Sequence, residues 1–219
     1  MPKPIATTGE LREALSTLCY DLGRAKDHHG LLNRLIEADK GQFQMAMSLS
    51  PVFWMLTGRA HFETTAMLLC RAYDWQEGAL TLRTMLETIR DRPDLHPAPD
   101  WPPRQVNAAR LVADLEWVNP KTNGAVRKLI VWRNNVFAHR DRRWATSKGG
   151  LGKVYPIPED QVNALVDNGF EIAQRYYGLL FGMHFDTFES QLNDFERTVS
   201  PVNEKLAAQI EPLKADVAE

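Results

Sequence analysis

The residues best suited to chemistry stand close together in one segment of the chain: Arg133, Asn134 and His139. A guanidinium group can hold a phosphate through two parallel hydrogen bonds. Histidine is the side chain most easily poised to move a proton near neutral pH. Together these groups can supply the phosphate binding and the proton transfer that are needed to cleave an RNA phosphodiester without a metal ion.

A run of basic residues follows the histidine. Between residues 139 and 153 there are five bases and one acid, so the local net charge is +4, although the whole chain carries -2. Local charge matters more than total charge for attracting a polyanion. A tryptophan in the run could stack on a base, or could instead be covered by another helix or a second subunit. The candidate RNA contacts are Arg140, Arg142, Arg143, Trp144 and Lys148.

Helices are the elements that must position these residues, because apolar residues recur at helical spacing along almost the whole chain. A first helix is expected to be capped by Thr8 and to be interrupted at Gly30. Its apolar residues at helical spacing are Leu11, Leu15, Leu18 and Leu22. Ser50-Pro51 predicts the start of a second helix that runs to about Trp75. This second helix is apolar on most of its circumference, at Phe53, Leu56, Ala60, Met67 and Cys70. Such a helix is expected in the centre of a bundle.

The second half of the chain predicts further helices and two loops. Five prolines within residues 92–103 exclude a regular helix there. Asn123 or Thr122 is expected to cap the helix that carries the arginine, and the basic loop spans residues 140–158. The predicted fold class is all-α, a bundle of about six to eight helices. The predicted domains are a bundle over 1–185 and an acidic helical extension over 186–219.

The arginine occupies an unusual position in its helix. At about 100° per residue, Arg133 falls in the middle of an apolar stripe. The stripe consists of Val126, Leu129, Ile130 and Phe137. A charge in such a position needs a partner, and the candidate carboxylates are Glu63, Asp74 and Glu87. His139 lies about 120° round a regular helix from Arg133, and its alternative role is to stabilise the helix C-terminus.

Other functional classes find little support in the sequence. Asp27-His28-His29 offers adjacent histidines that point apart on a helix, and residues 147–153 lack the pattern of a phosphate-binding loop. No metal or cofactor is expected. The two cysteines form no pairing pattern, which favours a reduced, cytoplasmic setting. No apolar run reaches the roughly 18 residues of a membrane span.

The motif resembles that of the HEPN superfamily (higher-eukaryote and prokaryote nucleotide-binding domains). That motif is an arginine, often followed by a polar residue, and then a histidine after a short, variable number of residues. Arg133-Asn134 followed by His139 matches it, with five residues between arginine and histidine. The stretch from Phe53 to Ala60, continuing to Arg71-Ala72-Tyr73-Asp74, looks like the long central helix of the abortive-infection U-type branch. The resemblance covers residues 10–185.

This resemblance implies a helical bundle that dimerises through the motif helices. Active members of the superfamily are metal-independent endoribonucleases, often toxins or antiphage factors. Carried over by position, Arg133 would bind and polarise the scissile phosphate, Asn134 would orient the arginine or the phosphate, and His139 would act as general acid and base. The alternative is a non-catalytic module that binds a nucleotide, RNA or a protein partner. An antitoxin is a further possible partner, and no membrane association is expected.

Overall fold

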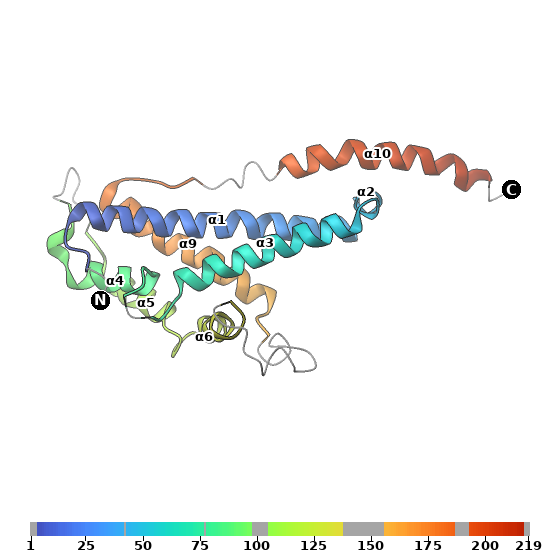
Figure 1. Ribbon diagram of the computed structural model, residues 1–219. Helices are drawn as coiled ribbons and strands as arrows, with labels where there is room; N and C mark the ends of the chain where they lie inside the picture. Colours follow the sequence, from blue (N-terminus) through green and yellow to red (C-terminus); the bar gives the residue numbers. More distant parts are fainter. Residues whose placement is uncertain are drawn as a thin grey trace. The chain divides into compact units, whose positions relative to one another are not determined.

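The fold is all-α, as predicted (Figure 1). The computed structural model describes residues 4–41, 43–76, 78–97, 105–137, 156–186 and 193–216, and within these ranges no strand occurs. A short 3₁₀ turn, Pro93–Leu95, and a π-helical turn, Arg133–Phe137, interrupt the α-helical pattern. No helix in these ranges is both long enough and apolar enough to cross a membrane. The described α-helices are α1 (Thr8–Lys40), α2 (Gln44–Ser48), α3 (Pro51–Ala72), α4 (Leu82–Asp91), α5 (Ala108–Trp117), α6 (Gly124–Trp132), α9 (Glu159–Phe181) and α10 (Asn193–Asp216).

The chain forms two compact units. The first comprises Met1–Ala25 and Ala66–Asp186, and the second comprises Lys26–Thr65 and Thr187–Glu219. The long helices α1 and α3 therefore each contribute residues to both units. In the second unit, α10 contributes Val199 to a small buried cluster with residues of α1 and α2. The predicted boundary between independent domains at residues 185 and 186 stays a prediction.

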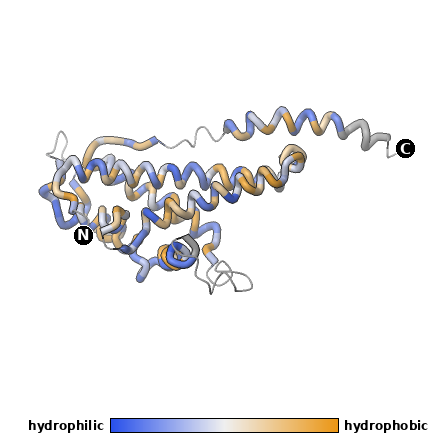
Figure 2. The backbone as a smooth tube through the Cα atoms, in the orientation of Figure 1, coloured by the Kyte–Doolittle hydropathy of each residue, from blue (hydrophilic) through white to orange (hydrophobic). Residues whose placement is uncertain are grey.

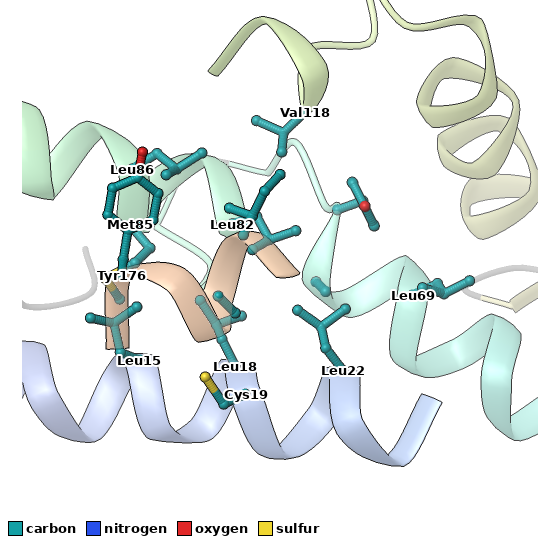
Figure 3. Packing of buried hydrophobic residues seen from close by; sticks show 14 of the residues in the cluster. Leu15, Leu18, Cys19, Leu22, Leu69, Leu82, Met85, Leu86, Val118 and Tyr176 are labelled. Atoms are coloured by element: carbon teal, nitrogen blue, oxygen red, sulfur yellow. The ribbon is translucent and has the colours of Figure 1, made fainter. Parts of the chain in front are cut away.

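The core of the first unit depends on one apolar stripe of α1. Four leucines of this stripe, spaced as predicted, are almost completely buried: Leu11, Leu15, Leu18 and Leu22. They pack with leucine, methionine and tyrosine side chains of α4 and α9 (Figure 3). Burial of this kind contributes roughly 1.5–3 kcal/mol for each large aliphatic side chain. The stripe therefore fixes which face of α1 lies inward in this unit.

Two predictions about α1 need correction. The helix is capped by Thr7 rather than Thr8, because the Thr7 hydroxyl accepts a hydrogen bond from the Glu10 N–H at 3.1 Å and the Glu10 carboxylate accepts from the Thr7 N–H at 3.2 Å. This reciprocal arrangement satisfies N–H groups of the first turn. Gly30 does not interrupt the helix, which continues to Lys40. A helical glycine costs only about 1 kcal/mol relative to alanine, so packing on either side can override it.

Helix α3 starts after Ser50, as predicted, but its first half is not the buried centre of a bundle. Phe53 and Leu56 are 58% and 54% exposed, and Ala60 and Met67 are also exposed. Only towards the end does the helix become buried, at Leu68, Leu69 and Cys70. An apolar circumference predicts that a helix will be covered, but it does not say that the same chain covers it.

The C-terminal end of α3 is held against α9 at one closely fitted point. Tyr73 is buried, and its hydroxyl donates a hydrogen bond to the Leu165 carbonyl at 2.8 Å. Burial raises the pKa of Tyr73, so the phenol remains a neutral donor. The tyrosine can approach because residue 169 is glycine: a Cβ there would lie 2.7 Å from the Tyr73 hydroxyl oxygen and 3.1 Å from a Leu22 methyl carbon. Gly169 thus provides space for three helical segments to meet.

Substituting this glycine should destabilise the protein. Gly169→Ala should lower the free energy of unfolding by roughly 1–3 kcal/mol, because the methyl group has to displace Tyr73 or Leu22. Gly58→Ala is the matched control, since its Cβ would find its nearest neighbour, a Leu32 methyl carbon, at 3.8 Å. That control should raise stability by about 0.5–1 kcal/mol, the usual gain from replacing a helical glycine. Chemical denaturation followed by circular dichroism measures both, and equal effects at the two sites would contradict the packing argument.

Both cysteines lie in the core as free thiols. Burial raises the pKa of Cys19 and of Cys70 to about 12, because a thiolate would lose its solvation there. For Cys70, nearby Arg133 opposes this rise and Asp74 adds to it. Since the folded pKa lies above the unfolded value, the neutral thiols stabilise the fold fully below the unfolded pKa, and this contribution is lost as the pH rises towards 12.

The native protein should therefore react slowly with thiol reagents. At about pH 8 both thiols are protonated and buried, and the thiolate is the reactive form. In guanidinium chloride, a chromogenic disulfide reagent should modify both cysteines at once. In buffer, the same reagent should modify them only as fast as the protein unfolds. Rapid modification of the native protein under the same mildly alkaline conditions would show that at least one thiol is accessible.

Candidate functional site

The candidate site is built on α6 and the turn that follows it. Asn123, one of the two predicted caps, starts the helix: its side-chain oxygen accepts hydrogen bonds from the N–H groups of Ala125 and Val126 at 3.0 and 3.4 Å. Val126 and Leu129 are buried, as the predicted apolar stripe requires. The stripe anchors α6 in the first unit and leads directly to Arg133, the residue after the helix ends.

The backbone changes its helical type at Arg133. Residues Arg133–Phe137 form a π-helical turn, in which backbone bonds span five residues instead of four. The Val131 carbonyl accepts a hydrogen bond from the side chain of Asn135 at 2.7 Å. In a regular α-helix this carbonyl accepts the backbone N–H of the residue four positions on, which is the same asparagine. The predicted regular helix through the motif is therefore wrong over Arg133–Phe137.

Arg133 is held by three partners. Its Nη2 atom donates to the carboxylate of Asp74 at 2.6 Å and to the side-chain oxygen of Gln76 at 2.9 Å. Its Nη1 atom donates to the side-chain oxygen of Asn134 at 2.7 Å. A guanidinium group that donates in several directions at once has its plane fixed. The sequence predicted that Asn134 orients either the arginine or the phosphate, and the contact seen is with the arginine. The part that Asn134 plays in a reaction stays a prediction.

The carboxylate partner is one of the three that the sequence suggested. Asp74 pairs with Arg133, whereas Glu63 pairs with Arg59 and Glu87 pairs with Arg83. The Asp74 side chain is only 13% exposed, and that of Arg133 is 27% exposed. The pair is therefore shielded from water far more than an ordinary surface ion pair, while one side of the arginine remains open.

The segment after α3 supplies two of the three partners of the arginine, Asp74 and Gln76, from one tight turn. The backbone N–H of Gln76 donates to the Asp74 carboxylate at 3.0 Å, and this bond orders the two side chains together. Trp75 stands between them, and the guanidinium carbon of Arg83 lies 3.9 Å from the centroid of its ring. Gln76, Trp75 and Arg83 were not singled out from the sequence, because their relevance depends on the turn that brings them near Arg133.

The guanidinium group retains capacity for a ligand. An arginine carries five N–H groups, and those used in the three contacts lie on Nη1 and Nη2. Within the described ranges, the Nε atom of Arg133 donates to no residue. A phosphate could therefore approach the open side of the arginine without breaking the bond to Asp74.

The remaining predicted site residues lie outside the described ranges. These residues are His139, Arg140, Arg142, Arg143, Trp144 and Lys148. The structure therefore places Arg133 and Asn134 together and leaves the rest of the predicted site as a prediction. Within the described ranges, no group of three or more histidine, cysteine and acidic residues is arranged to hold a metal ion.

Comparison with known proteins identifies the family. The HEPN family model described as AbiU2 matches residues 8–199. The chain belongs to the AbiU2 HEPN family. Its all-α architecture is thus a bundle of the HEPN type, which confirms the resemblance drawn from the motif and from α3. The AbiU2 match also reaches the start of α10, beyond the residues in which the resemblance was seen. No curated protein and no solved structure matches the chain.

The ion pair between Arg133 and Asp74 should contribute measurably to stability. Arg133→Ala and Asp74→Ala should each lower the free energy of unfolding by roughly 1–3 kcal/mol, because each leaves a partly buried charged partner with unmet hydrogen bonds. The double variant should be little worse than the worse single variant. Denaturant titration measures all three. Asp94→Ala, which removes an exposed pair with Arg92, is the control and should change stability little. Additive effects of the two alanines would contradict direct coupling.

Proposed function

We propose that this AbiU2 protein is a metal-independent endoribonuclease of the toxin or antiphage type. Arg133 binds the scissile phosphate, Asn134 helps to orient the guanidinium group, and His139 moves the protons. Membership of the HEPN family supports a ribonuclease role in general terms. The single observation that best supports the assignment to these residues is the fixed yet partly exposed position of Arg133.

Arg133 is suited to phosphate binding because its orientation is set before any ligand arrives. Asp74, Gln76 and Asn134 hold it within the protein. Preorganised donors stabilise developing charge more effectively than donors that must reorient during the reaction. The carboxylate of Asp74 also compensates the positive charge in the absence of RNA.

The proposed reaction needs only proton transfers and charge stabilisation. The RNA 2′-hydroxyl loses its proton to a base and attacks the adjacent phosphorus, while the bond from phosphorus to the 5′-oxygen breaks and that oxygen takes up a proton. The products are a 2′,3′-cyclic phosphate and a 5′-hydroxyl. Arg133 stabilises the negative charge on the non-bridging oxygens, and His139 serves as general acid or base.

The proposed site is composite and lies between two copies of the chain. Two motif segments would place two His139 side chains in one groove, together with both copies of the basic run. In each copy that run has a local net charge of +4, which would attract the RNA backbone. Arg140, Arg142, Arg143 and Lys148 are the proposed phosphate contacts, and Trp144 is the proposed base-stacking residue.

The alternative is a non-catalytic HEPN module that binds a nucleotide, RNA or a partner protein. The observation that favours it is the Arg133–Asp74 ion pair itself, because a structural arginine would need such a partner. In this alternative Arg133 contributes to stability and not to turnover. The two functions predict different rates of RNA cleavage when Arg133 or His139 is substituted and the protein stays folded.

The decisive prediction concerns cleavage in the absence of metal. Purified protein should cleave single-stranded RNA in EDTA and leave cyclic phosphate ends. His139→Ala should lower the rate by about 10²–10⁴-fold, the usual contribution of general acid–base catalysis. Arg133→Lys should also be strongly impaired, because lysine keeps the charge but cannot form the same planar set of bonds. Gel analysis of end-labelled RNA measures the rate and identifies the ends.

Stability must be measured on the same variants. His139→Ala should unfold at the same denaturant concentration as the wild type, so its loss of activity would be chemical. Equal cleavage by wild type and His139→Ala would reveal a contaminating nuclease. Absence of cleavage across varied RNAs, with the Arg133 variants affecting stability only, would favour the non-catalytic alternative.

A further inference from the structure

The short segment that follows α9, residues 182–186, turns back and lies along α1 within the first unit. The side chain of Met183 contacts Arg12 of α1. The rings of Phe185 and Tyr20 of α1 pack edge to face, with their centroids 6.0 Å apart. Figure 2 shows the segment between the end of α9 and the grey trace, with hydrophobic and hydrophilic residues in alternation. Its two hydrophobic side chains therefore attach it to α1.

The sulfur atom of Met183 lies where two hydrogen-bond donors converge. The Nη2 atom of Arg12 donates to it at 3.1 Å, and the hydroxyl group of Tyr177 in α9 donates to it at 3.2 Å. A thioether sulfur is only a weak acceptor, and methionine side chains ordinarily fill apolar gaps. The guanidinium group and the phenol therefore surround an atom that uses little of their capacity to donate.

Met183 can also be reached from solvent. It is 36% exposed, whereas Met47 and Met85 are only 6% and 2% exposed. Met55 and Met67 are exposed as well, but within the described ranges neither of their sulfur atoms accepts a hydrogen bond. Among these methionines, Met183 thus combines access for a small reagent with donors that are already in place around the sulfur.

We propose that Met183 is a site of reversible oxidation to methionine sulfoxide, and that Arg12 and Tyr177 bind the sulfoxide oxygen. The oxidant is hydrogen peroxide. A lone pair of the sulfur attacks one peroxide oxygen, and the bond between the two oxygens breaks. The proton of the attacked oxygen passes to the leaving oxygen, which departs as water. The sulfur loses two electrons, and the peroxide gains them.

Oxidation at this position should strengthen the attachment of residues 182–186. The sulfoxide group is polar, and its oxygen accepts hydrogen bonds far better than a thioether sulfur does. Because that oxygen is bonded directly to the sulfur, it lies within reach of both donors. A hydrogen bond from a charged guanidinium group is stronger than one between neutral groups. Oxidation of methionine usually disrupts packing, whereas here the surroundings favour the oxidised form.

A backbone amide in the same segment reports how firmly it is attached. The N–H group of Phe185 donates to the side-chain oxygen of Gln174 at 3.1 Å. Exchange of this hydrogen with solvent requires the segment to open, so its rate measures the stability of the attachment. The residues that take part are not those of the proposed catalytic site. The inference therefore does not depend on ribonuclease activity.

The test is hydrogen–deuterium exchange of the full-length protein before and after mild treatment with hydrogen peroxide. Peptide mass spectrometry should find sulfoxide at Met183 as well as at Met55 and Met67, while the buried methionines stay reduced. The Phe185 amide should then exchange about tenfold more slowly, the effect expected of one added hydrogen bond from a charged group. Treatment with methionine sulfoxide reductases should restore the original rate.

Three variants assign the effect to this site. Met183→Leu keeps an apolar side chain of similar size but cannot be oxidised, so peroxide should leave its Phe185 exchange unchanged. Tyr177→Phe preserves the ring and removes one donor, and Arg12→Gln removes the charged donor at an exposed position. Each should reduce the slowing, and the two together should abolish it. Helix content by circular dichroism confirms that the variants are folded.

The outcomes separate the proposal from oxidation elsewhere in the chain. Slower exchange in the oxidised wild type, absent from Met183→Leu and lost in the double donor variant, would establish the site. The proposal would be overturned if Met183 stayed reduced under conditions that oxidise Met55 and Met67. Unchanged or faster exchange after oxidation of Met183 would also overturn it, as would slowing that persists in Met183→Leu.

Discussion

The close approach of Tyr73 to α9 is the constraint on which the candidate site depends. The tyrosine hydroxyl binds the Leu165 carbonyl, and Gly169 leaves room for the ring. Asp74 is the next residue along the chain and cannot move far from this anchor. Since Asp74 and Gln76 both contact Arg133, a packing contact in the core determines where the guanidinium group lies.

The site therefore combines tightly packed helical segments with one irregular turn of the backbone. The apolar stripe of α6 and the anchored end of α3 are both parts of the same compact unit. Between them, the π-helical turn begins at Arg133, which contacts Asp74 and Gln76, and the Asn135 side chain donates to a carbonyl of α6. Irregular backbone is costly unless its polar groups find partners, and here a side chain provides one.

Sequence periodicity predicted the all-α class and the leucine stripe of α1, because both follow from which residues must avoid water. It also limited the partner of Arg133 to three acids that include Asp74. Sequence periodicity failed where tertiary contacts determine the local structure. The continuation of α1 through Gly30, the role of Gln76 and the π-helical turn depend on neighbours distant in sequence or on single side-chain bonds. The exposure of α3 shows the same limit, since the hydrophobicity of a helix does not by itself say which of its residues the fold covers.

The π-helical turn also bears on how the spacing of the motif should be understood. A π-turn accommodates one more residue than an α-turn, so it acts like a single-residue insertion absorbed without breaking the helix. Deleting one residue between Arg133 and Phe137 should therefore return the turn to regular α-helical geometry. Length and backbone type can thus compensate each other, so a change of one residue within this turn need not disturb the packing of α6.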